Sequence, residues 1–148
     1  MRVWIDGDSF PKPAMDVVLK IRRKESFELI VLADRDIPDV SSDGGVLRVV
    51  SHGSGDVDEI LVNETDAGDL VITRDFSLGI RLLEKDVRVM NDRGRIWDVR
   101  SLSRRIREAE IMNAARAGGI AREGGRSYDG GDKKSFADAL NRIISSHR

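Results

Sequence analysis

Residues 3–8 read VWIDGD and residues 69–75 read DLVITRD, and these two segments decide the fold of the chain. Each contains a run of apolar residues too short for a helix, which predicts a buried β-strand. Carboxylates follow both runs: Asp6 and Asp8 follow the first, and Asp75 follows the second. In an open α/β sheet the ligand site lies outside the carboxyl ends of the strands, so these acids are expected at that site.

Strand-like runs alternate with helix-like segments through the first two-thirds of the chain. Helices are predicted after Pro11 and Pro13, at residues 57–61 and at residues 76–84, with Asp75 as the N-cap of the last. Strands are predicted at residues 2–6, 27–33, 45–51, 70–73 and 87–90, with a short extension at 95–97. This alternation predicts a three-layer α/β/α fold with a mostly parallel central sheet of about five strands. The short link at Gly44 and Gly45 leaves the connection between the second and third strands open.

The last third of the chain has a different composition. Apolar residues recur every three or four positions from Val99 to Met112, and the other face of this predicted helix carries Arg100, Arg104, Arg105 and Arg107. A mobile, glycine-rich loop is predicted at residues 118–131, and a closing helix follows with Asp132 as its N-cap. We therefore expect one domain over residues 1–148, with an α/β core at 1–98 and the basic helix, loop and closing helix at 99–148.

The residue types restrict the possible chemistry. The 148 residues include no cysteine and two histidines, which excludes disulfides, a thiolate nucleophile and a Cys-ligated zinc site. A metal site must therefore use oxygen ligands, which favour magnesium, manganese or calcium. The N-terminal residues lack a signal-peptide pattern and no apolar run approaches about 20 residues, so we expect a cytoplasmic protein without a membrane partner.

Charge is distributed unevenly along the chain. Residues 1–92 carry 12 basic and 19 acidic side chains, whereas residues 93–148 carry 13 basic and 7 acidic ones, so the balance changes from −7 to +6. An acidic half beside a basic half suits a metal site flanked by a surface that binds phosphates. Arginine-rich helices that are simply well solvated would produce the same balance.

The acids differ in how strongly the sequence singles them out. Asp6 ends an apolar run, where a charge is costly without a use, and Asp75 follows a buried strand in the same way. Asp8 could reach the same cation across Gly7, although capping of the next helix would also explain it. At the start of the helix near residue 57, Asp56 is read as the cap, which leaves Asp58 available for a ligand. Asp92 is read as a turn residue, and Asp69 precedes its strand and is excluded from the site.

Several motifs together resemble the YaiI/YqxD family of uncharacterised bacterial proteins. They are VWIDGDSFP at residues 3–11, AGDLVITRD at 67–75, the N-x-R-G element at 91–94, and a G-G…D-x-x-x-F-A pattern at 124–137. The resemblance extends over nearly the whole chain. Two positions depart from the family pattern: Phe10 stands where members usually have cysteine, and Asp92 where many have proline.

The resemblance implies a PIN-like domain, an α/β fold in which clustered carboxylates bind Mg²⁺ or Mn²⁺ and hydrolyse phosphodiesters. It matches Asp6 to the first strand-end acid, Asp58 to the acid of the central helix, and Asp75 to the acid after the later strand. We expect these three to be catalytic and, together with Asp8, to hold the cation. The expected partner is nucleic acid, RNA rather than DNA, bound by Arg74, Arg93, Arg104, Arg105 and Arg126, with Tyr128 stacking on a base.

Two other functions fit the same residues. In a haloacid-dehalogenase-like phosphatase Asp6 would be the nucleophile, Asp8 the general acid and Thr73 the residue that ends a later strand. No lysine followed by a strand-ending acidic pair completes that pattern. The third possibility is a non-catalytic module that binds nucleic acid or protein and keeps its acids for metal binding or folding.

Overall fold

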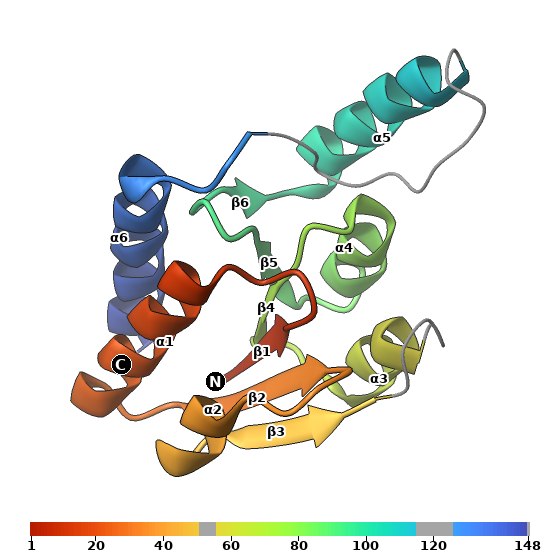
Figure 1. Ribbon diagram of the computed structural model, residues 1–148. Helices are drawn as coiled ribbons and strands as arrows, with labels where there is room; N and C mark the ends of the chain where they lie inside the picture. Colours follow the sequence, from red (N-terminus) through yellow and green to blue (C-terminus); the bar gives the residue numbers. More distant parts are fainter. Residues whose placement is uncertain (51–55, 115–125, 148) are drawn as a thin grey trace.

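The computed structural model describes residues 1–50, 56–114 and 126–147, which form an α/β fold of three layers (Figure 1). Within these residues a single sheet contains six strands: β1 (Arg2–Asp6), β2 (Glu28–Ala33), β3 (Val46–Val49), β4 (Leu70–Ile72), β5 (Arg88–Met90) and β6 (Ile96–Trp97). Strands β1 to β5 are parallel, and β6 pairs antiparallel with β5. The expected three-layer fold with a mostly parallel sheet is confirmed, and the sixth strand is the predicted extension at residues 95–97.

The strand order is β3-β2-β1-β4-β5-β6. The chain moves outward from β1 to β3 on one side and then crosses back to continue from β4 on the other side. In register, Ile5 of β1 lies between Val31 of β2 and Ile72 of β4. The order of the strands therefore reverses between β1 and β4, and in open α/β sheets the ligand crevice opens at such a point.

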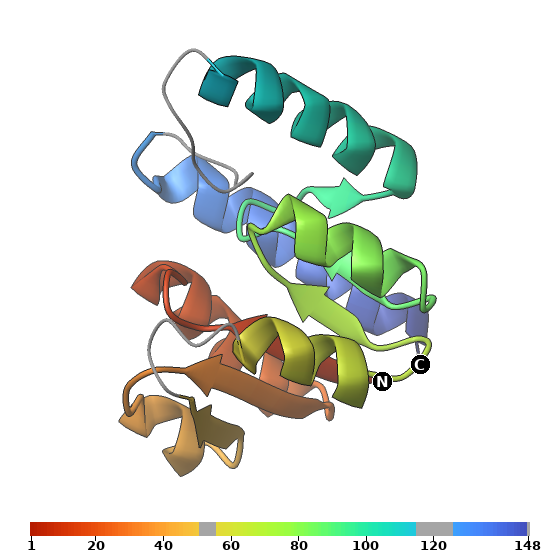
Figure 2. The same ribbon diagram turned by 90° about the vertical axis from the view of Figure 1, so that its right-hand side faces the viewer.

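Helices cover both faces of the sheet (Figure 2). One face carries α1 (Lys12–Lys24), α2 (Pro38–Ser42) and α6 (Gly130–His147), and the other carries α3 (Asp56–Glu64), α4 (Phe76–Leu83) and α5 (Val99–Ala114). Alternation along β1 directs Val3 and Ile5 to the first face and Trp4 to the second. Since Phe136 and Leu140 of α6 share the core of Val3 and Ile5, the C-terminal helix completes the layer that α1 begins.

The local sequence explains where the helices begin. Pro11 is the N-cap of α1, as the proline pattern predicts. The N-cap of α6 is Asp129, so the prediction of Asp132 was wrong. Asp132 is the third helical residue: its N–H donates to Oδ1 of Asp129 at 2.9 Å, and its Oδ2 accepts from the N–H of Asp129 at 3.0 Å. This reciprocal pair is a capping box, in which the two acids share the free N–H groups of the first turn.

The sequence did not predict α2, the short helix that connects β2 to β3. This helix has five residues and buries only Val40, so it shows no helical periodicity. Two predicted loops, Gly53–Asp56 and the glycine-rich residues 118–131, lie partly or largely outside the described residues. Among the described helices, none is both long enough and apolar enough to cross a membrane.

Candidate functional site

Two of the predicted site acids lie at or just beyond the carboxyl ends of neighbouring strands, at the point where the strand order reverses. Because β1 and β4 are parallel with Ile5 opposite Ile72, Asp6 lies beside Thr73 at the carboxyl edge of the sheet. Asp75 follows two residues after Thr73, and α3, which carries Asp58, begins at the same edge. The fold therefore brings Asp6, Asp58 and Asp75 to one edge from separate parts of the sequence.

Asp75 is oriented by the helix that it begins. Its Oδ1 accepts a hydrogen bond from the N–H of Leu78 at 3.1 Å, which confirms the predicted N-cap of α4. Its own N–H donates to Oγ1 of Thr73 at 3.1 Å. Both side chains are buried, so the strand end and the helix start hold the carboxylate in one position.

Gly7 allows the chain to turn closely over β2 between Asp6 and Asp8. Its N–H donates to the carbonyl of Leu32 at 2.7 Å, and a Cβ at this position would lie 2.9 Å from Cγ1 of Val31. Asp8 then accepts a hydrogen bond from the N–H of Asp34 at 2.6 Å through Oδ1. Asp8 is exposed, whereas Asp6 is half-buried and engaged in an interaction.

Asp34 is a residue at this edge that the sequence reasoning missed. It directly follows β2, much as Asp6 ends β1, and its backbone N–H donates to Asp8. An acid after an apolar run is the signal that singled out Asp6, and the same signal at residues 28–34 could have identified Asp34.

The carboxylates share an edge but do not form a closed metal cage. Among the described residues, no group of three or more Asp, Glu or His side chains is close enough to hold a metal ion. Asp58 is half-buried near the start of α3 and, like Asp6, is already engaged in an interaction. The donors at this edge are nevertheless all oxygens, the set that Mg²⁺ and Mn²⁺ prefer, and Mg²⁺ usually retains several waters.

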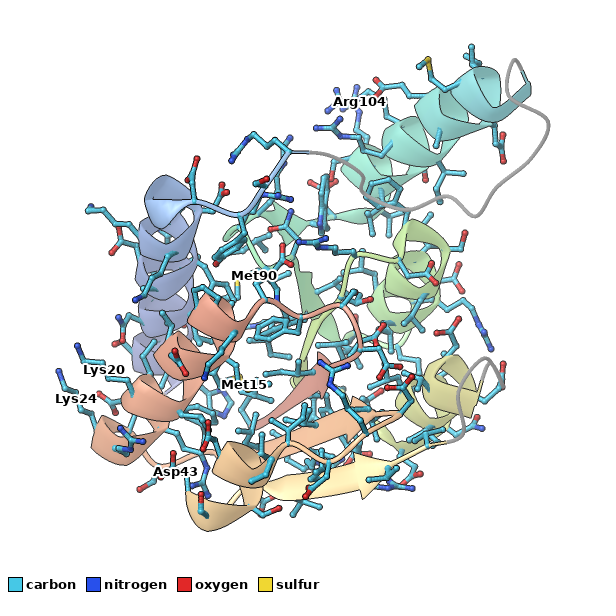
Figure 3. The ribbon with its side chains drawn as sticks, in the orientation of Figure 1. Met15, Lys20, Lys24, Asp43, Met90 and Arg104 are labelled. Atoms are coloured by element: carbon cyan, nitrogen blue, oxygen red, sulfur yellow. The ribbon has the colours of Figure 1, made fainter. Side chains whose placement is uncertain are left out.

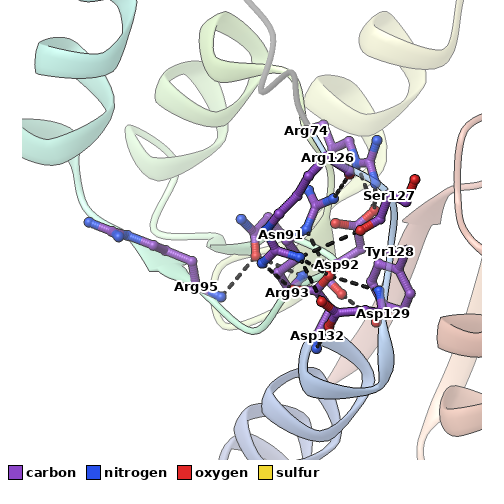
Figure 4. Close-up of polar contacts among 10 residues, drawn as sticks. All are labelled: Arg74, Asn91, Asp92, Arg93, Arg95, Arg126, Ser127, Tyr128, Asp129 and Asp132. Carbon is purple, nitrogen blue, oxygen red and sulfur yellow. Dashed lines mark hydrogen bonds and ion pairs between the residues drawn. The ribbon is translucent and has the colours of Figure 1, made fainter.

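Three of the five arginines predicted to bind nucleic acid take part in a cluster of ion pairs, shown in Figure 4. Nη2 of Arg74 lies 2.6 Å from Oδ2 of Asp92, whose side chain is only 2% exposed. Both terminal nitrogens of Arg126 donate to Asp132, each at 2.6 Å, in a bidentate pair. Nε of Arg93 lies 3.4 Å from the same carboxylate.

This arrangement shifts the pKa values of the groups in the cluster. The side-chain hydrogen bonds of Arg126 hold the pKa of Asp132 well below its usual range, and a hydrogen bond from the backbone of Asp129 adds to the effect. The pKa of Arg126 is raised in return. Burial raises the pKa of Tyr128 to about 12, and the negative charges of Asp92 and Asp132 act in the same direction.

Tyr128 connects the start of α6 to the turn after β5. Its hydroxyl donates to the backbone carbonyl of Asp92 at 2.7 Å, and its ring lies 5.9 Å from Cζ of Arg93. Within the turn, Oδ1 of Asn91 accepts from the N–H groups of Arg93 and Arg95. The N-x-R-G element thus has a structural role: it builds a turn that docks on α6.

The other two arginines lie on α5. Arg104 is exposed and projects away from the body of the protein (Figure 3). Arg105 lies 3.8 Å from Glu108, and its Cζ is 5.9 Å from the ring of Trp97. The five arginines therefore divide between a paired cluster beside α6 and the surface of α5.

Comparison with known proteins identifies the relatives of this chain. The family model described as "Uncharacterized BCR, YaiI/YqxD family" matches residues 4–146. A UPF0178 protein of Pseudomonas putida (strain GB-1) is 35% identical over 145 residues, which cover 98% of this chain and 97% of the relative. UPF0178 proteins of Stutzerimonas stutzeri and Aliivibrio fischeri are 34% and 30% identical, with 98% of this chain and 96% and 97% of the relatives covered. No solved structure matches significantly. The chain belongs to the YaiI/YqxD family.

Proposed function

We propose that this member of the YaiI/YqxD family is a nuclease that hydrolyses phosphodiester bonds with Mg²⁺ or Mn²⁺ at the carboxyl edge of its sheet. The observation that carries the proposal is the position of Asp6 and Asp75 on either side of the reversal in strand order between β1 and β4. Open α/β sheets bind their ligands at this point. A pair of acids there suits a cationic cofactor and, through it, an anionic substrate.

The proposed residues have distinct roles. Asp6, Asp58 and Asp75 would hold the cation, with Asp8 as an auxiliary ligand. A bound divalent cation lowers the pKa of a water and neutralises charge that develops on the phosphate. In Asp75 the ligand atom would be Oδ2, because Oδ1 accepts the N–H of Leu78. Thr73 supports this orientation by accepting the N–H of Asp75.

Cleavage of labelled single-stranded RNA and DNA in Mn²⁺ or Mg²⁺ tests the proposal. RNA is the first substrate to assay. Asp6→Asn should lower the rate at least about 100-fold because it removes a ligand charge while keeping the shape of the side chain. Glu84→Gln is the matched control, since Glu84 is an exposed acid at the opposite end of α4. Equal rates for wild type and Asp6→Asn would overturn the proposal.

One observation favours a second candidate, a nucleic-acid-binding module without catalytic activity. Among the described residues no three acids are gathered into a metal site, and Asp75 has a complete structural explanation as a helix cap. Such a module would bind single strands with affinity that falls steeply with salt and would leave them intact in Mn²⁺. Isothermal titration with Mn²⁺ separates the two, because the nuclease requires a site that Asp6→Asn weakens.

A further inference from the structure

A groove between α1 and α6 is bordered by lysines on both sides. It has a volume of about 430 Å³, and its floor includes Val17 and Ala137. Four lysines line it: Lys20 and Lys24 from α1, and Lys133 and Lys134 from α6. Asp16 is the one acid in the lining. We call this feature the lysine groove, and Figure 3 shows Lys20 and Lys24 projecting from α1 at its border.

The positions of Lys133 and Lys134 are not explained by helix stability. Both follow Asp132 in the beginning of α6, where the helix macrodipole is positive and disfavours a cation. Lys20 and Lys24, by contrast, lie in the second half of α1, where cations are favourable. All four lysines are exposed.

The lysine charges are largely free of carboxylate partners. Within the described residues, no ion pair joins Lys20, Lys24 or Lys133 to an acid. Lys134 lies 3.4 Å from Asp138, but both side chains are mostly exposed, and such pairs contribute little. The groove therefore has a net positive field that an anionic ligand could use.

We propose that the lysine groove binds the phosphate backbone of a single-stranded nucleic acid that extends from the carboxyl edge of the sheet. This proposal rests on the function proposed above and identifies where the substrate strand lies.

Two features favour this occupant over an acidic protein segment. The lysine ammonium groups on both sides of the groove act as point charges. They suit the regularly spaced phosphates of a nucleic acid, and such contacts do not depend on the base sequence. One end of the groove also lies toward the carboxyl edge of the sheet, because its lining residue Gly130 closely follows Tyr128, whose hydroxyl donates to the backbone carbonyl of Asp92 in the turn after β5. A strand in the groove would therefore continue toward Asp6 and Asp75.

Fluorescence anisotropy with a labelled 12-nucleotide uridine RNA in EDTA tests the proposal, because no cleavage occurs without metal. The variant Lys20→Gln/Lys24→Gln/Lys133→Gln/Lys134→Gln should bind about 10- to 100-fold more weakly at 100 mM salt. The slope of log K against log salt should fall in magnitude by two to three, since each single-strand phosphate contact contributes about 0.7. Asp16→Asn should tighten binding about two-fold. Circular dichroism will verify that each variant is folded.

A matched variant removes the same charge from another surface. Arg81→Gln/Arg88→Gln/Arg100→Gln/Arg107→Gln, at exposed arginines of α4, β5 and α5, should keep affinity within about three-fold of wild type. The proposal would be overturned if both variants lost affinity for the RNA equally, or if the wild type did not bind the RNA at 50 mM salt. It would also be overturned if an oligoglutamate of matched charge bound as tightly as the RNA. RNA that binds through the lysines but stays intact in Mn²⁺ would overturn the nuclease function alone. If the lysine substitutions left cleavage unchanged, the proposed role of the lysine groove would be overturned and the nuclease function would stand.

Discussion

The two ends of the sheet each bury a carboxylate beside an arginine, but they satisfy it differently. At the amino end, Asp69 is 4% exposed and accepts hydrogen bonds from the N–H groups of Arg2 and Asp66 and from Nε1 of Trp4. At the carboxyl end, Asp92 pairs with Arg74 through Oδ2 only. Oδ1 of Asp92 is buried and has no hydrogen-bond partner among the described residues.

This difference distinguishes Asp69, whose two oxygens both accept hydrogen bonds within the protein, from Asp92, which has one oxygen left to accept a bond from a water or ligand. Burial opposes the ionisation of Asp69, but its hydrogen bonds outweigh that cost and hold its pKa below the usual value. The amino end is therefore closed by the protein itself. The carboxyl end, which also carries Asp6 and Asp75, keeps an oxygen of Asp92 without a partner among the described residues, as expected where a water or ligand completes the structure.

The strongest test of the comparison is Asp69→Ala. Removing this carboxylate leaves one buried donor, Nε1 of Trp4, and two part-buried backbone N–H groups without an acceptor, so we expect a loss of about 3 kcal/mol in the free energy of unfolding. Because the pKa of Asp69 is lowered on folding, its stabilisation is present above about pH 4 and disappears as pH falls through the folded pKa. Urea denaturation at pH 7 and pH 3 measures both effects. Asp66→Ala, at a mostly exposed partner of Arg2, should cost less than about 1 kcal/mol.

Substituting one glycine at each end of the sheet tests how closely other atoms pack against the backbone there. Gly68 at the amino end and Gly94 at the carboxyl end both have positive φ, 89° and 86°. A Cβ on Gly94 would overlap the backbone of Ser135 in α6, whereas one on Gly68 meets nothing within 4 Å. We expect Gly94→Ala to cost about 2–3 kcal/mol and Gly68→Ala about 1 kcal/mol in thermal or urea unfolding. Equal costs would show that the turn does not dock tightly on α6.

Asp92→Asn tests whether the protein depends on only one of the two carboxylate oxygens of Asp92. The substitution weakens the ion pair with Arg74. It breaks no hydrogen bond at the position of Oδ1, which has no partner among the described residues, so we expect a loss of about 1–2 kcal/mol in the free energy of unfolding. The matched substitution Asp69→Asn should cost more, although both side chains are equally buried, because its amide nitrogen must face a donor. A larger loss for Asp92→Asn in urea denaturation would reverse the comparison.

The smallest effect is expected from Tyr128→Phe, which removes the hydrogen bond to the Asp92 carbonyl and should cost about 1 kcal/mol at pH 7. The pKa of Tyr128 is raised on folding to about 12, so its contribution is complete below about pH 10 and is lost as pH rises toward 12. Stability of the wild type should therefore fall more steeply than that of the variant between pH 10 and 12. Parallel curves would mean that Tyr128 titrates normally.

Local signals in the sequence predicted most elements of the fold. The apolar runs gave β1, β2, β4 and β5, and the acid after β4 was predicted as the cap of α4. The parallel edge that unites Asp6 and Asp75 followed from the same alternation of strands and helices. Strand order was not predictable, because the pairing of β1 with β4 joins residues more than 60 positions apart.

Long-range polar contacts account for what the sequence did not predict. Arg74 and Asp92 were read as a possible phosphate ligand and a turn residue, but the fold buries them as a pair. The lysine groove likewise combines residues 20 and 24 with residues 133 and 134, which are adjacent only after α6 packs on α1. The local sequence shows each of these residues only as an ordinary charged residue. It does not indicate which distant residue will become its neighbour.

The packing of α6 against α1 and β1 also affects the order of events during synthesis. Val3 and Ile5 emerge from the ribosome more than 100 residues before Phe136 and Leu140, which share their core. Until α6 has been made, the apolar face of β1 that it covers stays exposed, and exposed apolar surface of this kind favours aggregation. The lysine groove is assembled in the same step, so occupancy of that groove would report that α6 has packed on α1.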